Sequence, residues 1–409
     1  MARSRTDVRI LFCTRTLRLF AYGFLSVTLV LYLTALGISE QVIGFLFMLA
    51  LIGDVLISLS ITTSADRAGR RRMLITGALL IVLAGTVLAI TDNLFLIAAA
   101  ALVGVISPSG NEIGPFLSIE QAALSETTAD RKRTRMFAWY NLAGSLATAS
   151  GALLGGGFVQ ALQRAGLSEL ASYRSTLLVY ASVGVALALL FFCLSPDVEA
   201  TRPIVASSKR RLGLHRSRNT VAKLSGLFAL DAFAGGFVIQ SFVAYWFHVR
   251  FGAEPIVLGS IFFGANVLAG VSGLAAERVA ARIGLVNTMV FTHIPSNVLL
   301  MLVPVMPNLG SAIGVLLLRF SISQMDVPTR QSYTMAVVSP GERSAAAGVT
   351  TTARSIGALV SPALSGQLLS VPMLMGAPFF LAGGLKIIYD LLLYRSFRAT
   401  KPPEEAVTG

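Results

Sequence analysis

The sequence predicts an all-α membrane protein with twelve transmembrane helices in two pseudo-symmetric halves. Three observations support this fold class. The composition is strongly apolar, since 55% of the 409 residues are hydrophobic and 13% are charged, whereas ordinary soluble domains carry about 25% charged residues. Apolar segments of transmembrane length recur along the whole chain. The two halves of the chain also repeat several short patterns in the same order.

The apolar segments define the expected helices one by one. A helix needs about 20 apolar residues to cross the hydrocarbon core of a bilayer. Twelve segments meet this requirement, at residues 10–36, 40–63, 73–91, 94–124, 136–163, 172–194, 221–249, 254–276, 285–305, 309–337, 345–370 and 373–395. The first segment has no small-residue cleavage site matched to a short apolar core, so we expect a retained helix rather than a signal peptide.

Basic residues gather in alternate loops. One set of loops holds long basic runs, such as residues 70–72 and 209–211, and the other set holds only Arg164, Arg174 and Arg250. Because positive residues favour the cytoplasmic side of a membrane, we expect a multi-pass protein of the cytoplasmic (inner) cell membrane with both termini in the cytoplasm. The same rule accounts for the net charge of +13, so we expect no nucleic acid as a partner.

The longest polar segment divides the chain. Residues 195–220 lie between the sixth and seventh spans and contain a dense group of basic residues. We therefore predict an N-terminal six-helix bundle at 1–194, a basic cytoplasmic linker at 195–220, and a C-terminal six-helix bundle at 221–409 with a short cytoplasmic tail.

The two halves echo each other at four places. LGISEQVIG follows the first span and FGAEPIVLG follows the seventh; TTSADRAGRRRM follows the second and GLAAERVAARIG follows the eighth. The fourth and tenth spans contain NEIGPF and MDVPTR, and the fifth and eleventh contain SGALLGG and SPALSGQ. Four echoes in one order indicate two parallel repeats of six helices.

The loop DRAGRRR, residues 66–72, resembles the most specific signature of the major facilitator superfamily and lies in the matching loop. The resemblance covers essentially the whole chain. It implies two six-helix bundles that flank a central cavity and expose it to each side of the membrane in turn. The GPxxGG pattern of drug–proton antiporters reads GALLGG here, with Ala152 in place of proline. The resemblance is therefore antiporter-like and leaves the subfamily open.

The same resemblance assigns a gate. Asp66 would hold the neighbouring half through its charge and through a helix N-terminus, where a carboxylate is favoured, and this contact would close the cytoplasmic side. The expected gating residues are Asp66, Arg67, Gly69, Arg70, Glu277, Arg278 and Arg354.

Ionisable residues inside the predicted spans are the main functional signal, because they are costly in lipid. Six acids face six bases, so we expect most of them to neutralise each other. The acids are Asp54, Glu112, Glu120, Asp231, Asp326 and Asp390, and the bases are Arg15, Arg18, Arg319, Arg330, Arg354 and Lys386.

The tenth span carries the densest group of polar residues. At 100° per residue, one helix face would hold Arg319, Ser323, Asp326, Arg330 and Tyr333. Such a stripe must face protein or water, and Pro328 would bend the helix beside it. Asp326 and Arg330 are four residues apart, so they could also form a simple structural pair.

The superfamily resemblance implies that the first, fourth, seventh and tenth spans line the cavity. Besides the tenth span, the expected substrate- or proton-binding residues are Arg18, Tyr22, Asn111, Glu112 and Asp231. Glu112 has no local partner of opposite charge, and the same reasoning applies to Asp231, with Arg18 across the cavity as a possible partner. Both acids are therefore candidate proton carriers.

Other polar residues favour structural roles. Lys386 and Asp390 are four residues apart in the twelfth span, so we expect a buried pair. His293 lies beside Pro295 in the ninth span and is expected to be a hydrogen-bonded structural histidine. Two cysteines and three histidines without ligand spacing predict no metal and no cofactor.

The resemblance implies secondary active transport of a small molecule, and no catalytic constellation suggests an enzyme. The first expectation is proton-coupled efflux that uses Glu112, Asp231 and Asp326. The alternative is uptake or exchange of an anionic metabolite bound by Arg18, Arg319 and Arg330. A non-transporting membrane sensor or assembly partner is a third possibility, because fold does not prove function. The expected partners are the substrate, a proton and the lipid bilayer, and we expect a monomer.

Overall fold

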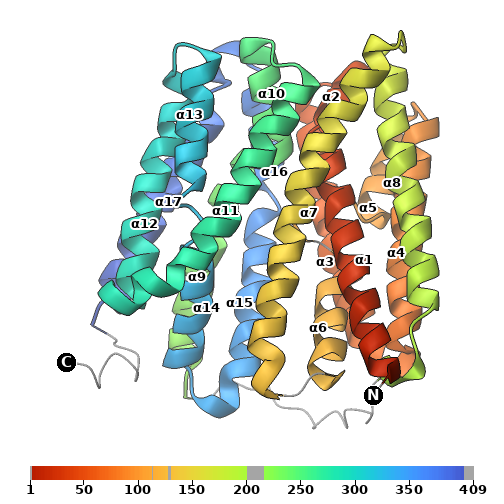
Figure 1. Ribbon diagram of the computed structural model, residues 1–409. Coiled ribbons are helices and arrows are strands. Elements are labelled where there is room, and N and C mark those ends of the chain that lie inside the picture. The colour runs from red at the N-terminus through yellow and green to blue at the C-terminus, as the bar shows by residue number, and fades with distance from the viewer. Residues whose placement is uncertain (1, 113, 128–129, 200–215, 400–409) are drawn as a thin grey trace. The chain divides into compact units, whose positions relative to one another are not determined.

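The computed structural model describes residues 2–112, 114–127, 130–199 and 216–399, and every element in these ranges is a helix (Figure 1). The contacts between residues define two compact units. Unit 1 comprises Met1–Ala206 with Gln240–Phe263, and unit 2 comprises Ser207–Ile239 with Gly264–Gly409. Residues 240–263 therefore pack with helices that precede the predicted linker, although they follow it in the chain.

Unit 1 is built from the following elements: α1 (Ala2–Ser26), α2 (Leu29–Ala35), α3 (Glu40–Ala68), α4 (Arg70–Ile90), α5 (Leu94–Val103), α6 (Phe116–Thr127), α7 (Asp130–Arg164), α8 (Glu169–Phe192), η1 (Pro196–Val198), α10 (Gln240–Phe251) and the start of α11 (Pro255–Ile283). Unit 2 contains the rest of α11 and these elements: α9 (Arg218–Gly235), η2 (Gly236–Val238), α12 (Leu285–Leu302), η3 (Val303–Val305), α13 (Leu309–Phe320), α14 (Asp326–Val337), η4 (Pro340–Glu342), α15 (Arg343–Ala358), α16 (Ser361–Leu369), η5 (Pro372–Leu374) and α17 (Ala377–Phe397).

All twelve predicted spans coincide with helical segments. Within the described residues, eight segments are long and apolar enough to cross a membrane, and α1 with α2 forms a ninth that is bent by 42°. The other three spans each consist of two shorter helices in series, namely α5 with α6, α13 with α14, and α15 with α16.

Five of the spans are interrupted, and four of these are the first, fourth, seventh and tenth. Their breaks lie at residues 27–28, 104–115, 236–239 and 321–325. The expected continuous stripe on the tenth span is therefore wrong, because α13 ends at Phe320 and α14 begins at Asp326. Non-helical backbone at membrane depth is tolerated only where protein or a water-filled cavity surrounds it. The breaks therefore mark interior positions of the same four spans that were expected to line a cavity.

The break in the fourth span is held by side chains from other helices. The hydroxyl of Tyr180 donates to the carbonyl of Val105 over 2.6 Å, and the backbone N–H of Gly114 donates to Asp54 over 2.6 Å. Gly114 has a φ of 81°, a conformation that glycine adopts without strain. These bonds satisfy backbone groups that a continuous helix would have paired internally.

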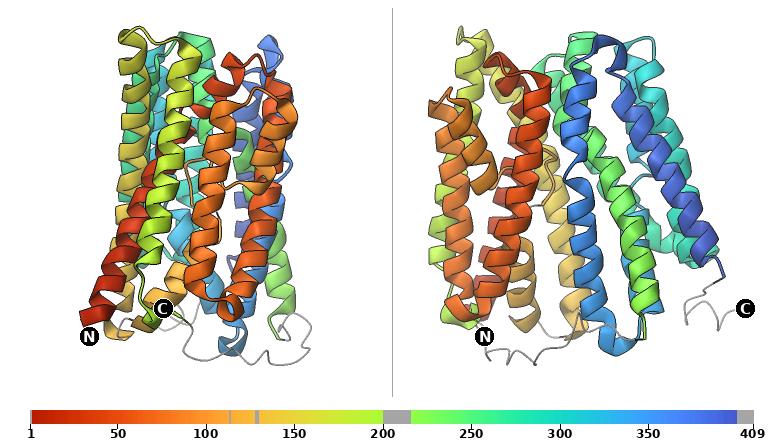
Figure 2. Two further views of the ribbon diagram at one scale, coloured as in Figure 1. Left: turned by 90° about the vertical axis from the view of Figure 1, so that its right-hand side faces the viewer. Right: turned by 180° about the vertical axis from the view of Figure 1, so that it is seen from behind.

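Close packing between pairs of helices holds unit 1 together. α1 runs alongside α7, and α4 runs alongside α8 (Figures 1 and 2). A side chain at Gly151 of α7 would meet the backbone N of Phe24 in α1 at 2.9 Å. Small residues allow transmembrane helices to approach in this way, and packing of this kind supplies much of their association.

We expect Gly151→Ala to destabilise the protein by about 1–3 kcal/mol, because the added methyl group overpacks a backbone contact. The measurement is thermal unfolding in detergent. Gly226→Ala is the matched control, since a side chain at Gly226 meets nothing within 4 Å. Equal melting temperatures for the two variants would show that the contact between α1 and α7 does not limit stability.

Candidate functional site

The charged site of unit 1 is centred on Arg18, which is fully buried in α1. Its two terminal nitrogens donate to the two carboxylate oxygens of Glu120 in α6, each over 2.8 Å. The hydroxyls of Tyr140 in α7 and Thr14 in α1 also donate to Glu120. A bidentate pair with two further donors is strong and geometrically fixed. Both carboxylate oxygens of Glu120 are therefore held by hydrogen bonds within this cluster.

Glu112 completes the cluster from the break between α5 and α6. The Nε of Arg18 donates to Glu112 over 2.9 Å, and an Nη of Arg15 lies 3.3 Å from its other oxygen. Glu112 has no partner nearby in the sequence, as expected, but two arginines of a distant helix, α1, pair with it in the structure. The Glu112 side chain is 13% exposed, whereas Glu120 is 0% exposed. Glu112 is the more weakly held and more accessible of the two acids.

The other predicted residues of unit 1 lie around the same break. Tyr22 is fully buried in α1, with its ring 6.4 Å from that of Tyr180. Asn111 lies in the break with an exposed side chain. Asp54 of α3 accepts from the backbone of Gly114 and from Ser58, and within the described residues it forms no ion pair.

The charged site of unit 2 is centred on Asp231, which is buried in α9. One of its oxygens accepts from Arg330 of α14 and from Arg354 of α15, each over 3.0 Å. The other oxygen accepts from Lys386 of α17 over 2.6 Å. The expected pairing of Asp231 with Arg18 is therefore wrong, and three cations of unit 2 take that place.

The predicted residues of the tenth span separate across its break. Asp326 begins α14 and lies 3.1 Å from Arg330, so the expected i, i+4 pair is present. Tyr333 is fully buried and packs edge-on against Phe397. Arg319 stays in the last turn of α13, where its guanidinium lies 4.7 Å from the ring centre of Phe320. Among the described residues, Arg319 has no carboxylate partner, and its buried Nε has no hydrogen-bond acceptor.

The expected pair of Lys386 with Asp390 is also wrong. Lys386 donates to Asp231, and Asp390 instead accepts from Asn297 and lies 2.9 Å from a ring nitrogen of His293. The expectation that His293 is hydrogen-bonded is confirmed. Spacing along one helix identified Lys386 and Asp390 as polar positions, but their partners lie on other helices.

The predicted gating residues lie in different surroundings. The side chains of Asp66 and Arg67 lie outside the part of the chain that the structure describes. Gly69 has a φ of 99° and precedes α4. The backbone N–H of buried Arg70 donates to Glu199 over 2.6 Å. A carboxylate at a helix N-terminus is favourable, and sequence reasoning missed this acid because it lies far along the chain.

The two remaining gating positions of the second half, Glu277 and Arg278, are exposed on α11. Arg354, which was also expected at the gate, has a side chain that is 35% exposed and reaches Asp231. The structure therefore groups Arg354 with the charged site of unit 2.

The two charged sites are built alike, but the positions of the acid and the arginine are exchanged between them. In unit 1, an arginine on the first span contacts acids of the fourth span. In unit 2, an acid on the seventh span, Asp231, contacts an arginine of the tenth span, Arg330. Both pairs join the first and fourth helices of a repeat.

The twelve ionisable residues selected from the span interiors do not balance within each unit. Of these twelve, unit 1 has three carboxylates, Asp54, Glu112 and Glu120, against two cations, Arg15 and Arg18. Unit 2 has three carboxylates, Asp231, Asp326 and Asp390, against four cations, Arg319, Arg330, Arg354 and Lys386. One carboxylate is therefore in excess in unit 1, and one cation is in excess in unit 2.

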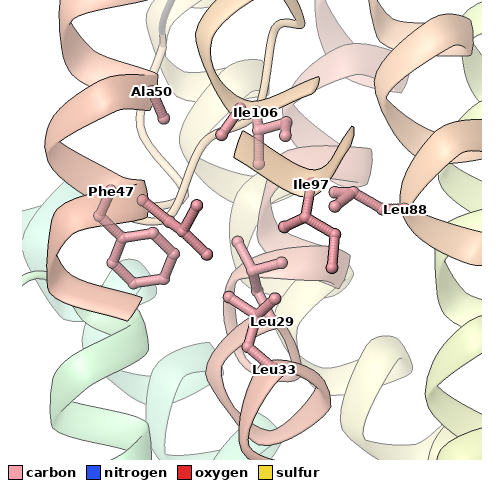
Figure 3. Close-up of a pocket in the computed structure, with 9 residues that line it drawn as sticks. Leu29, Leu33, Phe47, Ala50, Leu88, Ile97 and Ile106 are labelled. Atoms are coloured by element: carbon pink, nitrogen blue, oxygen red, sulfur yellow. The ribbon is translucent and has the colours of Figure 1, made fainter. Parts of the chain in front are cut away.

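An apolar pocket in unit 1 carries none of these residues. It is lined by side chains of α2, α3, α4 and α5 and by Ile106 (Figure 3). Leu29, Phe47 and Leu88 are among its lining residues. Such a surface offers no hydrogen bond that could orient a polar ligand, so the charged sites are the stronger functional candidates.

We expect Glu120→Gln to destabilise the protein by about 3–5 kcal/mol, because it leaves the buried guanidinium of Arg18 without its main counter-charge. Glu112→Gln is the matched comparison and should cost clearly less, since Arg18 keeps both bonds to Glu120. Thermal unfolding of the two variants checks this ranking. A larger loss for Glu112→Gln would contradict the assignment of Glu120 as the anchor.

Comparison with known proteins agrees with this architecture. Residues 11–362 match the sequence profile of the Major Facilitator Superfamily. The uncharacterized membrane protein YJR124C of Saccharomyces cerevisiae is 30% identical over 417 residues, which cover 95% of this chain and 93% of that protein.

Solved structures of low sequence identity show the same fold. A mutant of the nucleoside transporter NupG has a TM-score of 0.76 at 14% identity and covers 95% of this chain and 99% of its own. The human organic anion transporter MFSD10 has a TM-score of 0.62 at 18% identity, with the same coverage. A D-xylose–proton symporter has a TM-score of 0.71 at 15% identity and covers 95% of this chain and 97% of its own. The chain therefore belongs to the Major Facilitator Superfamily and is a multi-pass membrane protein with the fold of a secondary transporter.

Proposed function

We propose that this protein transports a small organic anion together with a proton. The observation that carries the proposal is the division of charge between the two units. Net charge that the buried groups of a unit do not balance among themselves is costly by several kcal/mol. The excess carboxylate of unit 1 therefore favours a bound proton, and the excess cation of unit 2 favours a bound anion.

Glu112 is the proposed proton carrier. It lies in the break of the fourth span, is partly exposed, and shares Arg18 with Glu120. When Glu112 takes up a proton, Arg18 keeps two bonds to Glu120, so the cluster survives. Arg15 then loses its ion-pair partner and retains one bond of 3.3 Å to Asn141. This change in contacts can favour one transport state over another.

The proposed anion ligands are Arg319 and Arg354, the least committed cations of unit 2. The buried Nε of Arg319 has no acceptor among the described residues, and Arg354 makes one hydrogen bond and is partly exposed. Asp231 holds two further cations, so an anion can recruit Arg354 without leaving that carboxylate unpaired. A guanidinium binds a carboxylate with two parallel hydrogen bonds, which favours an organic acid as the substrate.

Transport of an anionic metabolite is thus favoured over proton-coupled efflux, which was the first expectation from the sequence. Of the three carboxylates expected to serve efflux, Asp231 and Asp326 are buried in ion pairs with Arg330, and only Glu112 remains as a proposed proton carrier. The anion alternative is supported instead. One structural neighbour is named an organic anion transporter and another a proton symporter, so the proposed chemistry is compatible with the fold.

The proposed topology and the proposed cytoplasmic gate rest on the basic loops. The distribution of basic residues supports a cytoplasmic position for both termini and an orientation in the cytoplasmic membrane. The loop that contains Gly69 and Arg70 is proposed to act in the cytoplasmic gate, and its capping by Glu199 supports a defined conformation there. We further propose that residues 1–194 and 221–409 act as the two halves of a monomeric transporter.

We expect Glu112→Gln to uncouple transport from the proton gradient, because the side chain can no longer exchange a proton. Proteoliposomes with an imposed pH gradient should accelerate anion uptake for the parent protein and not for this variant. The exposed residue Glu254 provides the control variant Glu254→Gln, which should behave like the parent. Gradient-driven uptake in Glu112→Gln would exclude Glu112 as the essential carrier.

We expect small anions to raise the melting temperature of the purified protein. Arg354→Gln should weaken the apparent affinity for these anions about tenfold, because it removes one charge-assisted hydrogen bond. The probes are benzoate, succinate, phosphate and, as a cationic comparison, tetraphenylphosphonium. Arg282→Gln is the control, since Arg282 is exposed on α11. Stabilisation by tetraphenylphosphonium alone would contradict the anion proposal.

A further inference from the structure

A second group of ionisable side chains lies in unit 2, between α12 and α17. His293 and Asp390 are both buried, and a ring nitrogen of His293 lies 2.9 Å from the carboxylate. Asn297, one turn after His293, donates to the other oxygen of Asp390 over 3.3 Å. None of these side chains takes part in the sites described above.

The hydrogen bonds in this group are incomplete. Asn297 and Ser296 are fully buried, yet the Oδ1 of Asn297 and the Oγ of Ser296 have no partner among the described residues. Buried polar atoms in a purely structural cluster are normally satisfied. A proton reaches a buried histidine through polar groups that relay it. The unpaired atoms of Asn297 and Ser296 provide such groups in the helix that carries His293.

Lys386 connects this group to the charged site around Asp231. It lies one turn before Asp390 on α17, and its ammonium donates to Asp231 over 2.6 Å. It is thus placed between two carboxylates that belong to different groups. Among the described residues Lys386 forms no ion pair with Asp390, so the charge of Asp390 acts on Lys386 through space, across one helical turn of α17.

Other titratable groups lie on the helices that pack against α12 and contribute to the electrostatic potential at His293. α12 packs against α13, α14 and α17. The charged and titratable residues of these elements within the spans are Arg319, Asp326, Arg330, Tyr333, Lys386, Tyr389, Asp390, Tyr394 and Arg395. Among these groups, Asp390 lies within hydrogen-bond distance of the His293 ring, and the ring of Tyr389 lies edge-on to it at 6.1 Å between ring centres.

We propose that His293 and Asp390 form a second proton-binding site, which Lys386 couples to anion binding at the Asp231 cluster. A proton on His293 changes the pair from a net charge of −1 to zero. Asp390 then attracts Lys386 less, and the excess charge of unit 2 rises from +1 to +2. Electrostatics therefore makes anion binding tighter when His293 is protonated, and by linkage a bound anion increases proton binding at His293. The coupling to an anion rests on the proposed function, whereas the proton site does not.

The histidine content of the chain allows a direct test of the proton site. The sequence has three histidines, so His215→Gln with His248→Gln leaves His293 as the single imidazole. Its ¹⁵N NMR signals are followed between about pH 5 and 9 without any anion, a window that brackets ordinary histidine titration. We expect one titration step. Asp390→Asn should decrease the proton affinity of the imidazole, and Lys386→Met should increase it at least about threefold, the effect of removing a nearby positive charge.

Lys223→Met is the matched control, because Lys223 is an exposed lysine on α9, and it should leave the titration unchanged. An imidazole that does not titrate in this window would overturn the proton site. Equal effects of Lys386→Met and Lys223→Met would overturn the coupling even if His293 titrates.

A second measurement separates this inference from the proposed function. The stabilisation of the protein by benzoate, succinate and phosphate is compared at low and high pH in the parent protein and in His293→Gln. We expect binding to tighten at low pH in the parent and to lose part of that dependence in the variant. An unchanged pH dependence in His293→Gln would refute the coupling and leave anion transport intact. Failure of all three anions would refute the proposed function, and the NMR titration would still decide the proton site.

Discussion

Pairing of charge inside an apolar bundle is the constraint on which the rest of this structure depends. Arg18 is 0% exposed, and a guanidinium in such surroundings requires a counter-charge with good geometry. Glu120 supplies it in unit 1, and Asp231 has the corresponding function for Arg330 in unit 2. In both units the pair joins the first and fourth helices of a repeat. The same contacts that hold each bundle together therefore also place ionisable groups on the helices expected to face substrate.

The interrupted helices follow from the same requirement. A break at membrane depth exposes backbone donors and acceptors, which side chains of neighbouring helices must satisfy. Tyr180 and Asp54 do so for the break that carries Glu112. The break frees Glu112 from helical geometry and lets it approach Arg18 and Arg15. A partly exposed acid on a non-helical segment, beside a fully buried acid on a helix, gives one carboxylate for exchange and one for anchoring.

The sequence was sufficient for the number and order of the spans, because apolar length is a local property. It also identified the charged positions within them. It could not identify the partners: Lys386 is four residues from Asp390 but donates to Asp231 on another helix. Spacing along a chain reports only contacts on one helix, whereas the choice between helices depends on packing. The break before Asp326 was missed because residues 321–325, SISQM, contain no glycine or proline that would end a helix, and the expected stripe depended on an unbroken helix.

The division of charge, with a carboxylate in excess in unit 1 and a cation in excess in unit 2, links these structural facts to transport. It predicts that a proton and an anion cross the membrane in the same direction, because the proton offsets the carboxylate excess of unit 1 and the anion offsets the cation excess of unit 2. The most direct test is to record proton and anion movement at the same time in proteoliposomes, with a pH indicator inside and a radiolabelled organic acid outside. Entry of the acid accompanied by acidification of the interior beyond that of protein-free vesicles is the result that we predict. Entry of the acid while protons leave the vesicles would contradict the account, because it would show that the anion and the proton are exchanged in opposite directions.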